Sequence, residues 1–180
     1  MTIKIASLLT LMTLVCLPPG AGAQAGSTQA APVLSGEDIA KALQQRPAQV
    51  SRSRGLSRIP PAAPSISLNI PFKYNSSTLQ PQASSQLKQL ELALTSDSLR
   101  KDRFAIAGHT DAKGNPQYNK QLSLRRAESV KRFLTTNGVE TGRLDAVGYG
   151  SEQPLTPDQP DAPANRRVEI RDLGPAADAH

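Results

Sequence analysis

The sequence has few aromatic residues and no concentrated positive charge. Tryptophan is absent, and phenylalanine and tyrosine together make up 3% of the 180 residues. The net charge of +6 comes from 21 basic and 15 acidic residues that are spread along the chain. Proteins that bind nucleic acid usually combine a basic surface with aromatic side chains on which bases stack. The composition therefore argues against nucleic acid as a partner.

Long apolar runs are also missing, apart from one near the N-terminus. Lys4 is followed by an apolar run over residues 5–17, a Pro-Pro-Gly break, and the small residues 21–23. This order is typical of a cleaved export signal over residues 1–23, with the mature chain starting near Gln24. The run is shorter than the roughly 20 residues of a membrane-spanning helix, so no transmembrane segment is predicted in the mature chain.

Cysteine occurs once, as Cys16 within that signal. Residues 13–15 before it do not form the leucine and small-residue pattern of a lipid-attachment site, so lipidation is not expected. Once the signal is removed, the chain has no thiol for a disulfide or a cysteine metal site. Its stability must come from an ordinary packed core.

Residues 24–64 are rich in alanine, glutamine, serine and proline, and are predicted to be a disordered tether. One stretch within them has helical features. Ser35 suits a helix N-cap, and Ile39, Ala40 and Leu43 would form a short apolar stripe. We expect a nascent helix or a segment that docks on a partner.

From Ser65 the pattern becomes that of a folded domain, predicted to span residues 65–174 before a flexible tail at 175–180. Apolar and polar residues alternate over 66–70, which indicates a half-buried strand. A helix follows, because its apolar residues recur at intervals of four, three and four on one face: Ala83, Leu87, Leu90 and Leu94.

The second half repeats this order. Residues 104–107 are predicted to be a strand, 108–116 a loop and 118–137 a longer helix; 143–149 and 167–173 are two further strands. Two helices can hide their apolar faces only against the sheet, so the β-α-β-α-β-β order predicts an α/β two-layer sandwich. We expect a mixed sheet with the helices packed on one face, parallel pairing across the helical crossovers, and antiparallel pairing of the last two strands.

A polar run, Gly108-His109-Thr110-Asp111, ends the predicted second strand, and Arg126 follows Asp111 at a distance of fifteen residues. One acid and one base at this spacing could grip a ligand that carries both charges. Spacing permits this contact without requiring it. An internal salt bridge that positions the loop is the alternative.

Over residues 66–173 the chain closely resembles the OmpA-like C-terminal domain family, which includes OmpA-, Pal- and MotB-type proteins. Many short motifs match in order: Phe72-x-Tyr74-Asn75-Ser76-x-x-Leu79, Gly108-His109-Thr110-Asp111, Tyr118-Asn119, Leu122-Ser123-x-Arg125-Arg126-Ala127, Gly148-Tyr149-Gly150 and Asn165-Arg166-Arg167-Val168-Glu169-Ile170.

The resemblance implies non-catalytic binding of the diaminopimelate residue in the stem peptide of Gram-negative peptidoglycan. On the matching positions, Asp111 would receive the ligand's ammonium and Arg126 its carboxylate. Thr110 and Asn119 would form hydrogen bonds near the stem, and Asn75 would line the pocket. Capping and loop stabilisation are the alternative roles for these three.

Three basic residues of the matching motifs lie outside the predicted core site. Family members often have an acid where this chain has Lys73, which changes the polarity at the pocket's edge. Arg166 and Arg167 are adjacent at the start of a strand, so at most one of them faces the pocket. We leave both out of the predicted core site.

Catalysis is not expected. The domain has one histidine, His109, whereas a metal site normally needs three or four convergent ligands, and no Gly-x-Ser-x-Gly motif indicates a serine nucleophile. We predict no enzyme activity, metal or cofactor, and interpret His109 as a residue that orders the loop.

These features predict a protein of the Gram-negative periplasm that is associated with the cell wall and peripheral to the outer membrane, and that links an envelope component to peptidoglycan. The alternative is an envelope adaptor that holds a protein partner through residues 24–64, with wall docking as a secondary role.

Overall fold

The computed structural model describes residues 33–45 and 63–175. Its elements in chain order are α1 (Gly36–Gln44), β1 (Ser65–Leu68), α2 (Ala83–Thr95), β2 (Asp102–His109), α3 (Pro116–Thr136), β3 (Leu144–Gly150) and β4 (Val168–Pro175), with 3-10 turns at Thr141–Arg143 and Pro163–Asn165. The predicted β-α-β-α-β-β order is therefore confirmed from β1 onward. The predicted signal peptide, tether segments 24–32 and 46–62, and tail 176–180 lie outside the described residues, whereas Pro175 still belongs to β4.

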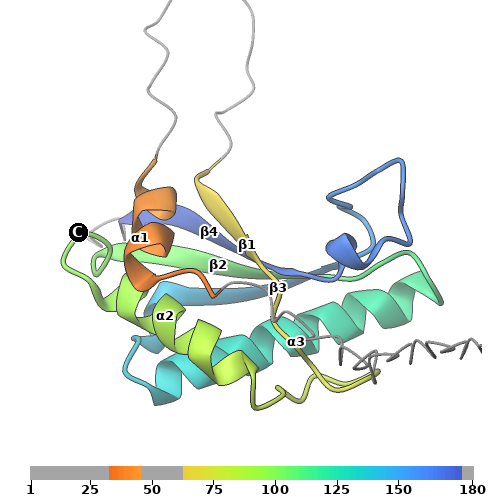
Figure 1. Ribbon diagram of the computed structural model, residues 1–180, viewed down its shortest axis with the longest axis horizontal. Coiled ribbons are helices and arrows are strands. Elements are labelled where there is room, and N and C mark those ends of the chain that lie inside the picture. Colours follow the sequence, from red (N-terminus) through yellow and green to blue (C-terminus); the bar gives the residue numbers. More distant parts are fainter. Residues whose placement is uncertain (1–32, 46–62, 176–180) are drawn as a thin grey trace, which may run out of the picture. The chain divides into compact units, whose positions relative to one another are not determined.

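The four strands form one mixed sheet in the order β1-β4-β2-β3 (Figure 1). β2 and β3 pair in parallel across the α3 crossover, as predicted. The expected antiparallel pairing of the last two strands is wrong, because β4 pairs with β1 and β2 and not with β3. β1 and β2 are likewise not neighbours, since β4 lies between them. The long connection over residues 151–167 carries the chain back to this central position, where both edges of β4 find backbone partners.

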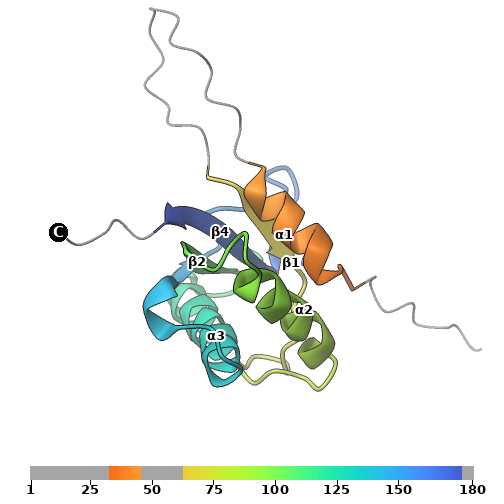
Figure 2. The same cartoon turned by 90° about the vertical axis from the view of Figure 1, so that its left-hand side faces the viewer.

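Helices α2 and α3 cover one face of the sheet, as the end-on view shows (Figure 2). Fully buried side chains fill the space between the two layers; among them are Leu87, Leu90, Phe104, Ile106, Val130, Leu134 and Ile170. Each such side chain contributes about 1.5–3 kcal/mol through its removal from water. The predicted α/β sandwich with helices on one face is confirmed.

Two glycines allow α3 to lie unusually close to the sheet. A Cβ atom at Gly108 of β2 would lie 2.1 Å from the backbone oxygen of Ser123, and one at Gly148 of β3 would lie 2.5 Å from the backbone nitrogen of Leu124. No side chain fits in these gaps. The Ser123 hydroxyl also accepts a buried 2.8 Å hydrogen bond from the Gly150 backbone N–H, which fixes the first half of α3 on the strand ends.

Helix α1 belongs to the folded domain. Ser35 caps it as predicted, with its hydroxyl accepting a hydrogen bond from the Asp38 backbone N–H. The predicted apolar stripe is buried: Ile39 and Leu43 are fully covered and join the common core. The Gly36 backbone N–H donates to the Gln89 side chain of α2 at 2.8 Å. The short helix predicted within residues 24–64 is therefore present at residues 36–44, and its apolar stripe packs within the same chain.

Within residues 33–45 and 63–175, no helix combines the length and the hydropathy needed to cross a membrane.

Candidate functional site

All five residues predicted for the site line one pocket of about 700 Å³. The pocket lies at the end of the sheet where β1 and β2 end and β4 begins, next to the first half of α3. The predicted residues that line it are Asn75, Thr110, Asp111, Asn119 and Arg126. The loop after β2 thus returns alongside α3, so an acid and a base fifteen residues apart share one concave surface.

Asp111 forms a salt bridge, but with a different partner from the one the sequence indicated. Its carboxylate lies 2.9 Å from Nη1 of Arg166, which follows the 3-10 turn Pro163–Asn165 two residues before β4. The Asp111 side chain is 14% exposed and the Arg166 side chain 49% exposed. Because Arg166 is half exposed, this pair is open to exchange with a ligand at low energetic cost.

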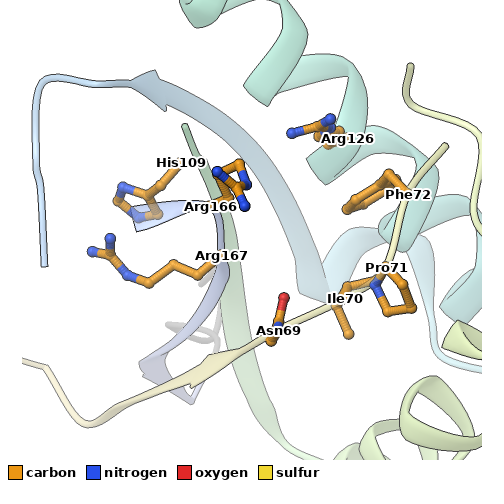
Figure 3. A pocket seen from close by; sticks show the side chains of 8 residues that line it. All are labelled: Asn69, Ile70, Pro71, Phe72, His109, Arg126, Arg166 and Arg167. Carbon is orange, nitrogen blue, oxygen red and sulfur yellow. The ribbon is translucent and has the colours of Figure 1, made fainter. Parts of the chain in front are cut away.

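Arg126 is held in place without a neutralising acid. Its Nε donates a 3.0 Å hydrogen bond to the Ser76 carbonyl oxygen, and its guanidinium lies 5.0 Å from the centre of the Phe72 ring (Figure 3). In the part of the chain that the structure describes, no carboxylate lies within salt-bridge distance of it. Burial lowers the pKa of Arg126 and the charge of Arg166 lowers it further, whereas Asp111 acts in the opposite direction. An anion entering the pocket would relieve this unfavourable burial of charge.

Thr110 and Asn119 differ in how fully their polar groups are used. The Thr110 side chain is buried, and its hydroxyl has no hydrogen-bond partner among the described residues. The Asn119 amide donates to the carbonyl oxygen of Lys113 at 2.8 Å and more weakly to that of Asp111 at 3.4 Å. Asn119 therefore holds the loop that carries Asp111, whereas the Thr110 hydroxyl can form a hydrogen bond with a ligand.

Asn75 lines the pocket from the turn after β1. Its φ of 50° lies in the left-handed region, which asparagine tolerates better than most residues. Its side-chain oxygen accepts a 2.7 Å hydrogen bond from the Tyr118 hydroxyl. Lys73 lines the same pocket and adds positive charge.

Arg166 is the pocket residue that the sequence analysis left out. Arg166 lines this pocket, whereas Arg167 does not. The alternation of buried residues along the predicted strand could have indicated which of the two arginines lines the pocket. In the sequence, Arg166 alternates in step with Val168 and Ile170, which belong to the core, although β4 itself begins only at Val168. The pairing with Asp111 was not available, because the two residues are 55 positions apart.

His109 is the last residue of β2 and not part of the loop, which starts one residue later. It is 1% exposed, stacks on the Tyr149 ring at 5.5 Å, and places Nε2 3.2 Å from a Glu169 carboxylate oxygen. Contact with His109 is the main influence that holds the pKa of Glu169 well below its usual range; burial opposes it, and Arg171 contributes in the same direction as His109. Among the described residues, no group of three potential ligands could hold a metal ion.

Known proteins are similar to this chain in sequence and in fold. Residues 71–167, more than half of the chain, match the OmpA family. A peptidoglycan-associated lipoprotein of Pseudomonas putida is 36% identical over 102 residues, which cover 56% of this chain and 60% of that protein. Outer membrane protein A of Shimwellia blattae is 34% identical over 104 residues, which cover 58% and 43%. The match thus spans at most about 60% of the length of these relatives.

Solved structures support the same assignment. The peptidoglycan-associated lipoprotein from Burkholderia pseudomallei is 32% identical, with a TM-score of 0.50 over 59% of this chain and 88% of that one. A putative MotB-like protein from Desulfovibrio vulgaris is 29% identical, with a TM-score of 0.52 over 60% and 73%. The chain therefore belongs to the OmpA family.

Proposed function

We propose that the domain binds peptidoglycan without cleaving it, by holding the diaminopimelate residue of a stem peptide in the pocket of Asp111 and Arg126. The side-chain end of diaminopimelate carries an ammonium and a carboxylate. Asp111 would receive the ammonium, and Arg126 would receive the carboxylate through charge-assisted hydrogen bonds. The protein would link an envelope component to the wall in the Gram-negative periplasm.

The observation that carries this proposal is the state of Arg126. Its guanidinium is partly buried, held by the Ser76 carbonyl, and faces a pocket that contains one carboxylate, which Arg166 already neutralises. A cation in this state favours an anionic ligand. Two relatives with about one third identity are named peptidoglycan-associated lipoproteins, which agrees with a ligand from the cell wall.

Binding requires an exchange at Asp111. The incoming ammonium would take over the carboxylate from Arg166, whose half-exposed side chain is then released toward the ligand. A lysine-type stem would supply the ammonium but no carboxylate at the same end, and would leave Arg126 unpaired. Diaminopimelate should therefore be preferred over lysine.

Co-sedimentation with purified sacculi tests the assigned site. We expect Asp111→Ala and Arg126→Ala to abolish binding to diaminopimelate-type sacculi while the fold persists. Arg100→Ala is the matched control, because Arg100 is exposed and its salt bridge with Asp97 spans one turn, away from the pocket. Wild-type protein should sediment far less with lysine-type sacculi. Undiminished sedimentation of both site variants would refute the assignment.

The alternative role, an adaptor that holds a protein partner through residues 24–64, is less well supported where those residues form α1. The apolar stripe that would have contacted a partner is buried against the domain itself. The stretches 24–32 and 46–62 lie outside the described residues, so a partner site there stays a prediction.

A further inference from the structure

A second, smaller pocket of about 170 Å³ adjoins the first. It shares Phe72, Arg126 and Arg166 with the larger pocket, and His109, Arg167 and residues 69–71 complete its lining. Figure 3 shows Arg126 and Phe72 on one side, with Arg166, Arg167 and His109 on the other. Its volume suits a group of the size of a carboxylate.

The two pockets together carry far more positive than negative charge. The cationic side chains that line them are Lys73, Lys113, Arg126, Arg166 and Arg167, whereas Asp111 is the only carboxylate in either lining. Glu169, which lies outside both linings, is engaged by His109 at 3.2 Å and by Arg171 at 2.8 Å. A ligand group with one ammonium and one carboxylate is neutral and would leave this excess uncompensated.

Arg167 provides the second observation. Its side chain is only 9% exposed, and its Nε and Nη1 have no hydrogen-bond partner within the described ranges. Its Nη2 makes one long hydrogen bond, 3.3 Å to the Gln153 carbonyl, and lies 3.6 Å from Glu169. Buried guanidinium donors without acceptors are unfavourable, and an anion in the small pocket would satisfy them.

From this arrangement we infer that the small pocket is a subsite for a second carboxylate, so that the domain prefers stem peptides in which diaminopimelate is the C-terminal residue. This inference rests on the proposed function. A terminal diaminopimelate has a free main-chain carboxylate in addition to its side-chain carboxylate. When another amino acid follows, the main-chain group becomes a neutral and bulkier amide, and Arg167 loses its ligand.

Calorimetric titration of the full chain with two soluble muropeptides tests this inference. One is a tripeptide stem that ends in diaminopimelate, and the other is the tetrapeptide stem with one further alanine. We expect the tripeptide to bind on the order of tenfold more tightly, the effect of one charge-assisted contact. Inorganic phosphate should compete with the tripeptide more strongly than with the tetrapeptide.

Arg167→Gln should reduce tripeptide affinity to the tetrapeptide level and leave tetrapeptide affinity unchanged, whereas Arg100→Gln, with the same loss of charge, should change neither. Arg167→Lys covers the case in which the glutamine variant does not fold; it should retain part of the tripeptide preference. Equal affinity of the wild-type chain for both stems would overturn the subsite and leave the proposed function intact. Failure of both stems to bind would overturn the proposed function as well.

Discussion

Several basic side chains surround Glu169 on the face of the sheet that points away from α2 and α3. His109, Arg167 and Arg171 all lie within 3.6 Å of its carboxylate, and the Arg171 guanidinium also lies over the Tyr149 ring. The residue is 8% exposed, so its charge is tolerated only because these partners surround it. This cluster supports the end of β2 from which the loop bearing Asp111 departs.

The loss of stability on replacement of Glu169 should therefore depend on pH in a defined way. The folded-state pKa of Glu169 lies below its usual value of 4.5, so its contribution is fully present above that pH and is lost as the pH falls further. We expect Glu169→Gln to lower the free energy of unfolding by about 1.5–3 kcal/mol at pH 7. The difference from wild type should shrink between pH 4.5 and pH 2.

Urea unfolding followed by circular dichroism at several pH values measures this difference. Glu128→Gln serves as the control, because Glu128 is exposed on α3. A destabilisation by Glu169→Gln that stays constant down to low pH would contradict the role given to its charge.

At the scale of elements, the close approach of α3 to β2 and β3 determines the site. α3 supplies Asn119 and Arg126, and its distance from the strands is set by backbone atoms in direct contact with Gly108 and Gly148. The helix cannot be lifted without moving Arg126 away from the loop of Asp111.

Gly108→Ala should thus damage both fold and binding. The new methyl group would overlap the Ser123 carbonyl oxygen and force the helix from the sheet, at a cost of about 1–3 kcal/mol or more. We expect a lower melting temperature and weaker sedimentation with sacculi. Gly142→Ala is the matched control, since an added Cβ there meets nothing within 4 Å. Equal behaviour of the two variants would show that the contact is not needed.

The sequence was sufficient to predict the elements but not their pairing. A strand or helix that is buried on one side has apolar residues at regular intervals in its sequence. Ile66 and Leu68 show this for a strand, and Leu87 and Leu90 show it for a helix. Strand order depends on which edge β4 reaches after residues 151–167, and no periodicity encodes that choice. This is why the pairing of the last two strands was predicted wrongly.

In the pocket, too, local features were predictable from the sequence and contacts between distant segments were not. The residues predicted from the family motifs lie together, but the salt bridge of Asp111 with Arg166 depends on a contact between distant segments. Helix α1 is a similar case, because an apolar stripe formed by Ile39 and Leu43 looks the same whether it covers its own domain or a partner. Only the fold shows which surface receives it.

For the molecule as a whole, α1 extends the core beyond the family match at residues 71–167. Its stripe packs against α2 and β1, and contributes the fully buried Ile39 and Leu43. We expect residues 36–44 to unfold together with the rest of the domain.

Leu43→Ala tests this cooperativity. Removal of a fully buried leucine side chain costs about 2–5 kcal/mol, so the whole domain should unfold earlier, in a single transition. Lys41→Ala on the exposed side of the same helix is the control. Thermal and urea unfolding give the measurement, and an unchanged midpoint for Leu43→Ala would mean that α1 is not part of the cooperative unit.

The antiparallel register of β1 and β4 has a mechanical consequence. Ser65 pairs with Arg171 at one end of the strands, while Leu68 and Val168 pair at the end next to the pocket. The chain therefore enters β1 and leaves β4 at the end of the sheet remote from the pocket. Tension between an upstream attachment and a ligand held in the pocket would run lengthwise along these strands. Their hydrogen bonds would then resist in shear, sharing the load, instead of being peeled apart one by one.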